Sequence, residues 1–368
     1  MRILAIETSC DETSAAVVAG DGDTVRIVSN IVGSQLKTHI LYGGVVPELA
    51  ARRHAENLIP IVREALFQAN IKEKDASRAL DAVAVTYGPG LVIALLVGVE
   101  TAKSLAFAWD IPLIGVNHLE GHIYSVLGAG PAVYGDNPLS ELDAGFFNEP
   151  LVALIVSGGH TELVHIEKYG VYQYLGRTRD DAAGEAFDKV ARMLGLPYPG
   201  GPSLSNSAIK GRRDGYNFPR PMMSDPNCEF SFAGLKTQVL YTVRELEKSG
   251  GSQAVAQAAP DIAASFQEAI VDVLIAKTIY AASLRECRSI IITGGVSANS
   301  RLREKMSEAA KAYGLSCYFP YPSLTGDNAG MIGIAAYLKV RYTKKYDDVF
   351  SLRANPKLSL ESAFSNFQ

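Results

Sequence analysis

Cysteine is scarce in this chain of 368 residues, and its copies are scattered at Cys10, Cys228, Cys287 and Cys317. They form no C-x-x-C pair, which argues against a cysteine zinc site or a disulfide framework and fits a reducing compartment. Long apolar runs are also lacking, because the longest, residues 91–99, is far below the roughly 20 residues of a membrane span. No leader-like segment opens the chain, since Glu7 interrupts the first apolar run. We therefore expect a cytoplasmic protein.

The chain also lacks a large excess of positive or negative charge. The net charge is −4, so the whole chain has no nucleic-acid signature, and any RNA contact requires local basic patches or a partner. With 48% hydrophobic and 20% charged residues, the composition is that of a packed globule, and the length predicts two domains or lobes. Neither a G-x-G-x-x-G fingerprint nor a Walker A loop is present.

The segment VNHLEGHIYSVL, residues 116–127, carries two of the six histidines. His118 and His122 are four residues apart, which places both imidazoles on one face of a helix. A carboxylate from elsewhere completes a metal site with open positions for a substrate, and Asp327 in the run TGDNAG is the candidate. The simpler alternative is a pair of surface or capping histidines. A zincin protease is excluded, because H-E-x-x-H requires an acid where Leu119 stands.

Strand and helix patterns alternate along the chain, which predicts an α/β fold. The opening residues 2–34 read as a three-strand meander whose first turn carries Glu7, Asp11 and Glu12. Such a turn can position a cation or a nucleophile, or it can be an ordinary hairpin turn. A second meander begins at residue 151, which predicts two lobes of the same architecture. Residues 129–150 are rich in turn residues and are expected to contain the lobe boundary.

Two glycine-rich turns follow strands in the second half. The turn SGGH exposes backbone N–H groups at Ser157, Gly158 and Gly159 that suit an anion, although Gly-Gly is also common in hairpins. The strand SIIIT runs through Gly294 and Gly295 into a helix that carries Asn299, an arrangement that binds nucleotides in many α/β folds.

Together these segments resemble one family, the tRNA threonylcarbamoyladenosine transferases of the bacterial TsaD type. The matching motifs, in order, are IETSCDET, YGGVVPELAARRH, NHLEGH, VSGGHTEL, DDAAGEAFDK, YPGGP, GGVSAN and TGDNAG. The resemblance implies the sugar-kinase/actin-like (ASKHA) fold, with two lobes around a nucleotide cleft. Each lobe is expected to have a mixed sheet that opens with a three-strand meander and is flanked by helices. The expected lobes are residues 1–128 plus 330–368, with the His pair, and residues 129–329, with the glycine-turn motifs.

The resemblance also implies roles for individual residues. It implies one divalent metal ion, with Fe(2+) expected and zinc as the alternative. The implied metal ligands are His118, His122 and Asp327, the implied substrate contacts are Ile155, Val156, Ser157, Gly158, Gly159, Asp188, Gly201 and Asn299, and the residues implied near the reacting centre are Asp11 and Glu12. One position departs from the family pattern, because Ser205 stands where relatives often have a carboxylate, so no contact is assigned there.

The implied reaction moves a threonylcarbamoyl group from threonylcarbamoyl-AMP to N6 of the adenosine 3′ to the anticodon, position 37, in tRNAs that read codons beginning with A. The implied partners are tRNA, a shorter paralogue of TsaB type and a small ATPase of TsaE type. Two alternatives stay open from the residues themselves. One is an ATP-dependent small-molecule kinase of the same superfamily, and the other is a non-catalytic nucleotide-binding scaffold of a tRNA-modifying complex.

Overall fold

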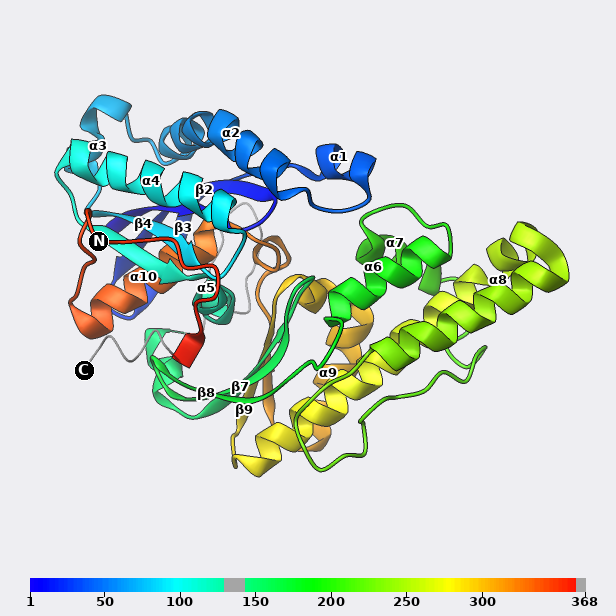
Figure 1. Cartoon of the computed structure of the whole chain (residues 1–368). Coiled ribbons are helices and arrows are strands. Elements are labelled where there is room, and N and C mark those ends of the chain that lie inside the picture. The colour runs from blue at the N-terminus through cyan, green and yellow to red at the C-terminus, as the bar shows by residue number, and fades with distance from the viewer. Residues whose placement is uncertain (129–142, 362–368) are drawn as a thin grey trace. The chain divides into compact units, whose positions relative to one another are not determined.

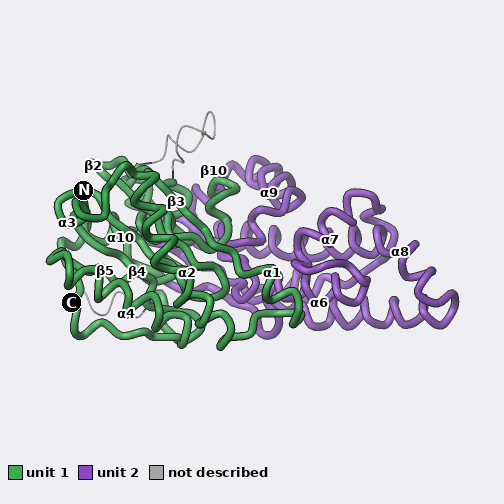
Figure 2. Tube along the Cα trace, turned by 90° about the horizontal axis from the view of Figure 1, so that it is seen from above, with its two compact units in different colours: residues 1–149, 167–172, 320–368 green, residues 150–166, 173–319 purple. Residues whose placement is uncertain are grey.

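The computed structural model describes residues 1–128 and 143–361. The chain divides into two compact units (Figures 1 and 2). Unit 1 comprises residues 1–149, 167–172 and 320–368, and unit 2 comprises residues 150–166 and 173–319. The end of the chain thus rejoins its beginning, and Asp327 lies in the same unit as the His pair.

The sheet of unit 1 has five strands in the order β3-β2-β1-β4-β5. They are β1 (Arg2–Glu7), β2 (Glu12–Asp21), β3 (Thr24–Ser34), β4 (Ala82–Gly88) and β5 (Leu113–Asn117). The first three form an antiparallel meander, and β4 and β5 continue the sheet parallel to β1. Because the parallel strands are covered on both faces, every residue from Ile3 to Ile6 is fully buried.

Helices cover both faces of this sheet. The longer ones are α2 (Pro47–Gln68), α4 (Val92–Trp109) and α10 (Ala329–Thr343), and the shorter ones are α1 (Leu36–His39), η1 (Ile40–Tyr42), η2 (Glu73–Asp75), α3 (Ala76–Ala79), α5 (His118–Tyr124), η3 (Ser125–Leu127), η6 (Ala144–Asn148) and η8 (Pro322–Leu324). Helices α2 and α4 pack together and against β2 and β4, and α10 packs against β1, β2 and α5 (Figure 1).

Unit 2 repeats the sheet of unit 1 strand for strand. Its order is β10-β9-β6-β7-β8, with β6 (Leu151–Val156), β7 (Thr161–Lys168), β8 (Val171–Arg177), β9 (Ser289–Thr293) and β10 (Ser316–Tyr318). Strand β6 pairs antiparallel with β7 and parallel with β9, as β1 does with β2 and β4. The predicted repeat of the opening meander is therefore confirmed.

The helices of unit 2 are α6 (Ala183–Met193), α7 (Gly200–Ala208), α8 (Ala233–Leu284), η7 (Gly295–Ala298) and α9 (Ser300–Ala312). Helix α8 contacts α6, α7, α9 and the strands β6 and β9, so it is the central packing element of the unit (Figure 1). Non-helical backbone at Gly250 and Gly251 divides it into two helical segments.

The predicted fold class is confirmed, because both units are α/β with a mixed five-stranded sheet that opens with a meander. The lobe boundaries given above stay a prediction. Part of the segment expected to contain one of them, residues 129–142, lies outside the described residues.

Helix α4 is long and apolar enough to cross a membrane by length and composition. In the structure its small residues Ala94, Gly98 and Ala102 are buried, and the helix packs on α2 and β4. The same composition is found in helices that cover the core sheet of an α/β unit.

Close packing of α10 on the sheet depends on a glycine. A Cβ atom at Gly333 would lie 2.3 Å from Cγ2 and 2.9 Å from Cβ of Val18 on β2. We expect Gly333→Ala to lower the free energy of unfolding by about 1–3 kcal/mol through overpacking. Gly234 is the matched control, because a Cβ there meets nothing within 4 Å. Gly234→Ala should be neutral or stabilising by up to about 1 kcal/mol, since alanine is the better helix former. Urea denaturation of both variants checks the opposite signs.

Candidate functional site

Strand β5 runs directly into helix α5, which carries the His pair. Asn117 caps this helix, because its side-chain oxygen accepts a hydrogen bond from Leu119 N at 2.9 Å. His118 and His122 then lie one turn apart, with ring centroids 4.7 Å from each other, and both are buried. The local sequence alone therefore places both imidazoles on one face at the end of a sheet strand.

The third member of the group comes from the loop that precedes α10. Oδ1 of Asp327 lies 3.2 Å from Nε2 of His122 and 3.5 Å from Nε2 of His118. Asn328 caps α10 by accepting from Met331 N, and this fixes the chain next to Asp327. A Cβ at Gly121 would lie 2.7 Å from Cδ1 of Ile332, so the glycine of NHLEGH allows α5 to approach α10 closely.

These three side chains can hold a metal ion. Their ligand atoms all lie within 4.8 Å of one another. For bonds of about 2.1 Å, neighbouring ligands of a tetrahedral or octahedral ion are roughly 3.0–3.4 Å apart, which is close to the two separations that involve Asp327. Two imidazoles and one carboxylate are ligands that suit transition metals such as iron and zinc, and a set of three ligands leaves further coordination positions open. The residues predicted as ligands thus fit a metal ion.

Glu120 does not join this group. Its Oε1 accepts a hydrogen bond of 2.7 Å from the hydroxyl of Tyr172 instead. The acid that lies between the two histidines in the sequence therefore faces another partner, as its spacing predicts. This agrees with the exclusion of a zincin site.

A second carboxylate, Glu7 at the end of β1, supports His118 from behind. Its Oε2 lies 3.1 Å from Nδ1 of His118, and it also accepts from Thr86 at 2.5 Å. Its Oε1 accepts from Ser9 N at 2.5 Å. Burial would raise the pKa of Glu7, but the interaction with His118 lowers it. Burial would lower the pKa of His118, but Asp327 and Glu7 raise it to about 9.

Glu7 contacts the His118 side chain, and no role was predicted for it from the sequence. It appeared there as one of several acids in a turn, whereas the structure makes it the partner of a ligand candidate. The sequence does contain a signal for such a residue, namely an acid directly at the end of an apolar strand. A buried carboxylate needs several hydrogen-bond donors to stay ionised, so an acid at this position indicates polar partners from other segments.

Asp11 and Glu12 lie in the turn between β1 and β2 and at its end. Oε1 of Glu12 accepts from Ser34 Oγ at 2.8 Å, whereas its buried Oε2 has no hydrogen-bond partner among residues 1–128 and 143–361. Burial raises the pKa of Glu12 to about 7, and the charges of Asp11 and Asp327 act in the same direction. A carboxyl group with this pKa exchanges a proton near neutral pH, as a general base must.

His54, a buried residue of α2, forms hydrogen bonds on both sides of the turn that carries Asp11 and Glu12. Nε2 of His54 donates to the carbonyl oxygen of Cys10 at 3.0 Å, and Nδ1 lies 2.8 Å from Thr13 Oγ1. Because a carbonyl only accepts, Nε2 carries the proton and Nδ1 accepts. Burial lowers the pKa of His54, which keeps this neutral tautomer. The backbone N of Gln35 adds a hydrogen bond to the Asp11 carbonyl at 3.3 Å.

The glycine turn lies in unit 2, between β6 and β7. Ser157 and His160 close it with hydrogen bonds between Ser157 N and His160 O at 2.8 Å and between His160 N and Ser157 Oγ at 3.2 Å. Gly158 and Gly159 are exposed, and a Cβ at either one would meet nothing within 4 Å. Ile155 and Val156 are fully buried, so a ligand can meet their backbone but not their side chains.

The remaining predicted contact residues form a continuous series from this turn through unit 2. Gly184 N, at the start of α6, donates to Ser157 O at 3.2 Å. Asp188 on α6 accepts through Oδ1 from the N–H groups of Gly200 at 2.8 Å and Gly201 at 3.2 Å, which caps α7. Asn299, the cap of α9, donates to Ser205 of α7 at 2.9 Å. The structure therefore brings these residues together within one unit.

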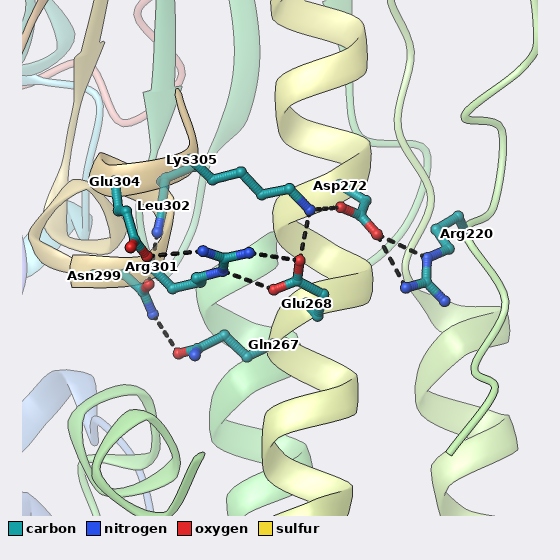
Figure 3. Close-up of polar contacts among 9 residues, drawn as sticks. All are labelled: Arg220, Gln267, Glu268, Asp272, Asn299, Arg301, Leu302, Glu304 and Lys305. Atoms are coloured by element: carbon teal, nitrogen blue, oxygen red, sulfur yellow. Dashed lines mark hydrogen bonds and ion pairs between the residues drawn. The ribbon is translucent and has the colours of Figure 1, made fainter. Parts of the chain in front are cut away.

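The side-chain amide of Asn299 has three hydrogen-bond partners, and two of them, Leu302 and Gln267, are drawn in Figure 3. Its Oδ1 accepts from Leu302 N at 3.0 Å as the cap of α9, and its Nδ2 donates to Gln267 at 2.8 Å and to Ser205 at 2.9 Å. Ser205, the position that departs from the family pattern, is thus a partner of Asn299.

Charged side chains next to Gln267 tie α8 to α9 (Figure 3). Arg301 forms a two-pronged ion pair with Glu268 at 2.8 and 2.9 Å, and Lys305 contacts both Glu268 and Asp272. Arg301 and Lys305 lower the pKa of Glu268 to about 2, against the effect of burial. These pairs fix α9, the helix that Asn299 caps.

The fold and the site together define the class of protein to which this chain belongs. The chain is an α/β protein with a duplicated five-stranded sheet, a His–His–Asp group that can hold a metal ion, and a glycine turn. The family model described as tRNA N6-adenosine threonylcarbamoyltransferase, TsaD, matches residues 26–334. The chain belongs to this family.

Relatives of the same name cover nearly the whole chain. The one from Moorella thermoacetica is 50% identical over 359 residues, which are 98% of this chain and 97% of the relative. The one from Desulfitobacterium hafniense is 47% identical over 360 residues, 98% of each. Among solved structures, full-length HypF in its phosphate- and nucleotide-bound form has a TM-score of 0.58 at 12% identity, with 94% of this chain and 47% of that chain covered. At that identity the likeness shows the fold alone.

The metal-binding group yields a direct prediction. We expect Asp327→Asn to weaken zinc binding by at least about 100-fold, because an amide is a poor substitute for an anionic ligand. Asp110→Asn makes the same change at an exposed position after α4, where asparagine suits the left-handed backbone, and should leave the affinity unchanged. Competition with a chromogenic chelator measures both. Equal affinities of the two variants would exclude Asp327 as a ligand.

The pKa of Glu12 predicts how stability depends on pH. Between its ordinary value of 4.5 and about 7, the folded protein keeps a proton that the unfolded chain releases, so stability falls as pH rises through this window. Glu12→Gln removes the titrating group, so this loss of stability at higher pH should disappear. The variant should melt at a higher temperature than the wild type at pH 8, and the gap should close towards pH 4.5. Glu308→Gln on the exposed face of α9 is the control, which should give no such gap. A constant difference across pH would contradict the assignment.

Proposed function

We propose that this chain transfers the threonylcarbamoyl group of threonylcarbamoyl-AMP to N6 of the adenosine at position 37 in tRNAs that read codons beginning with A. Membership of the family and identities of 46–50% over nearly the full length support this activity. The observation that carries it in the structure is the convergence of His118, His122 and Asp327 on one point. A small-molecule kinase of this superfamily needs no such His pair.

The chemistry explains why a metal site is useful. The exocyclic amine of adenine is a weak nucleophile, because its lone pair is delocalised into the ring. Its nitrogen attacks the carbamoyl carbon, the bond from that carbon to the phosphate oxygen breaks, and AMP leaves with the electron pair while N6 loses a proton. A bound cation would act as a Lewis acid or a template without redox change. We propose Fe(2+) as this ion, held by His118, His122 and Asp327, with zinc as the alternative.

The chain's own residues supply binding and proton transfer. We propose that the exposed N–H groups of Gly158 and Gly159 bind the phosphate of the adenylate, as unobstructed backbone N–H groups bind anions in other proteins. The backbone at Ile155, Val156 and Ser157 continues this surface. Asp188, Gly201 and Asn299 would then contact the nucleoside, with Asn299 already oriented by Gln267 and Ser205.

Glu12 is our candidate for the proton acceptor. Its pKa of about 7 leaves a large fraction ionised at neutral pH, and its Oε2 has no partner within the described structure. Asp11, its neighbour in the turn, would order the acceptor amine or raise the basicity of Glu12 through its charge. The target adenosine lies in a single-stranded loop, so it can enter a site without opening a duplex.

We propose that the protein works in the cytoplasm with a shorter paralogue of TsaB type and a small ATPase of TsaE type. Apolar side chains on α2 and α4 support a protein partner at this face of unit 1. Ile59 and Phe67 of α2 are 41% and 75% exposed, and Leu96 of α4 is 42% exposed. Exposed apolar side chains on two helices that pack together are available to a protein partner.

The activity is tested by mass spectrometry of tRNA nucleosides after incubation with threonylcarbamoyl-AMP, with and without the two partner proteins. We expect modified adenosine with the wild type and a loss of at least about 100-fold with His118→Ala, because positioning and charge stabilisation at the site are removed. His165→Ala, outside the triad, should retain activity. Release of ADP with a sugar or acid acceptor would favour the kinase, and unmodified tRNA in every combination would favour the scaffold.

A further inference from the structure

The carboxylate of Glu7 receives three hydrogen bonds, and two of the donors are fixed. The backbone N of Ser9 points at Oε1, and the hydroxyl of Thr86 and Nδ1 of His118 point at Oε2. Glu7 is fully buried, and so is Thr86. A buried carboxylate with this many donors is oriented rigidly.

This arrangement determines which nitrogen of His118 keeps its proton when a metal ion binds to the other. An ionised carboxylate only accepts, so Nδ1 of His118 must donate to Oε2. Nε2, on the side of Asp327, is then the nitrogen that gives up its proton when a metal ion binds. The hydroxyl of Ser9 is 3.2 Å from the same Nδ1, but a hydroxyl can either donate or accept and does not choose between tautomers.

Glu7 also connects the metal ligand to the turn that carries Asp11 and Glu12. Its two oxygens hold His118 on one side and the Ser9 amide on the other, and Ser9 is two residues from Asp11. One carboxylate thus fixes both the orientation of a ligand and the start of the turn.

We propose that Glu7 is a positioning residue that makes His118 a metal ligand through Nε2 by holding its proton on Nδ1. Carboxylate partners of ligand histidines typically contribute about 10–100-fold to metal affinity, and we expect the same range for Glu7. The inference rests on the proposed metal site, and it assigns a role to a residue that is not itself a ligand.

The decisive variant is Glu7→Gln, because the orientation of its amide is forced. The Ser9 N–H can only donate, so the amide oxygen must take the place of Oε1 and the NH2 group that of Oε2. Thr86 can accept from this NH2, but His118 can do so only with an unprotonated Nδ1. Its proton then moves to Nε2, which is the nitrogen required for the metal.

Zinc affinity of the full-length protein, measured by chelator competition, gives the first readout. We expect about 10–100-fold weaker binding for Glu7→Gln and a change below about threefold for Thr86→Val. Thr86→Val is the matched control, since it removes a donor to the same oxygen and leaves the carboxylate that faces His118. Equal affinity of Glu7→Gln and the wild type would overturn the proposal. Failure of the wild type to bind zinc would instead contradict the metal site itself.

A second readout needs only the wild type and so does not depend on the folding of a variant. In zinc-loaded protein with 15N-labelled histidine, NMR should show a proton on Nδ1 of His118 and zinc on Nε2. His118→Gln assigns the signal by its loss. Zinc on Nδ1 with the proton on Nε2 would overturn the proposal.

Discussion

A buried negative charge at the end of the central strand β1 is the constraint on which the ligand side of unit 1 depends. Ionised Glu7 is fully excluded from water, and such a charge is costly unless several donors surround it. Thr86 from β4 and His118 after β5 provide two of them. The carboxyl ends of three neighbouring strands therefore meet at one residue, and this is the edge where α/β sheets usually place their functional groups.

Much of this site could be predicted from local sequence, because the relevant geometry is local. The spacing of His118 and His122 fixes a shared helix face whatever the remaining fold. Asp327 was predicted together with them from its motif. Its distance from the imidazoles is set by the packing of α10 on α5, and this packing cannot be derived from the spacing of residues in the sequence. Glu7 was not assigned, because an acid at a strand end has the same appearance as an ordinary turn residue until its donors are known.

The same distinction holds in unit 2. The repeated meander was predictable from periodicity, and Asn299 is recognisable as a helix cap from its place before α9. Its hydrogen bonds to Gln267 and Ser205 were not predictable, since they join segments 32 and 94 residues away. Ser205 had been set aside as a departure from the family pattern. In the structure it belongs to the hydrogen-bonded surroundings of a predicted contact residue.

The two sheets share more than their strand order. The turn after β1, residues 8–11, and the turn after β6, residues 157–160, each join the first two strands of a meander with four residues. One reads TSCD behind an acid, and the other reads SGGH behind a valine. The same four-residue connection therefore carries acidic and hydroxyl side chains suited to organising a cation in one unit, and bare glycine amides suited to an anion in the other.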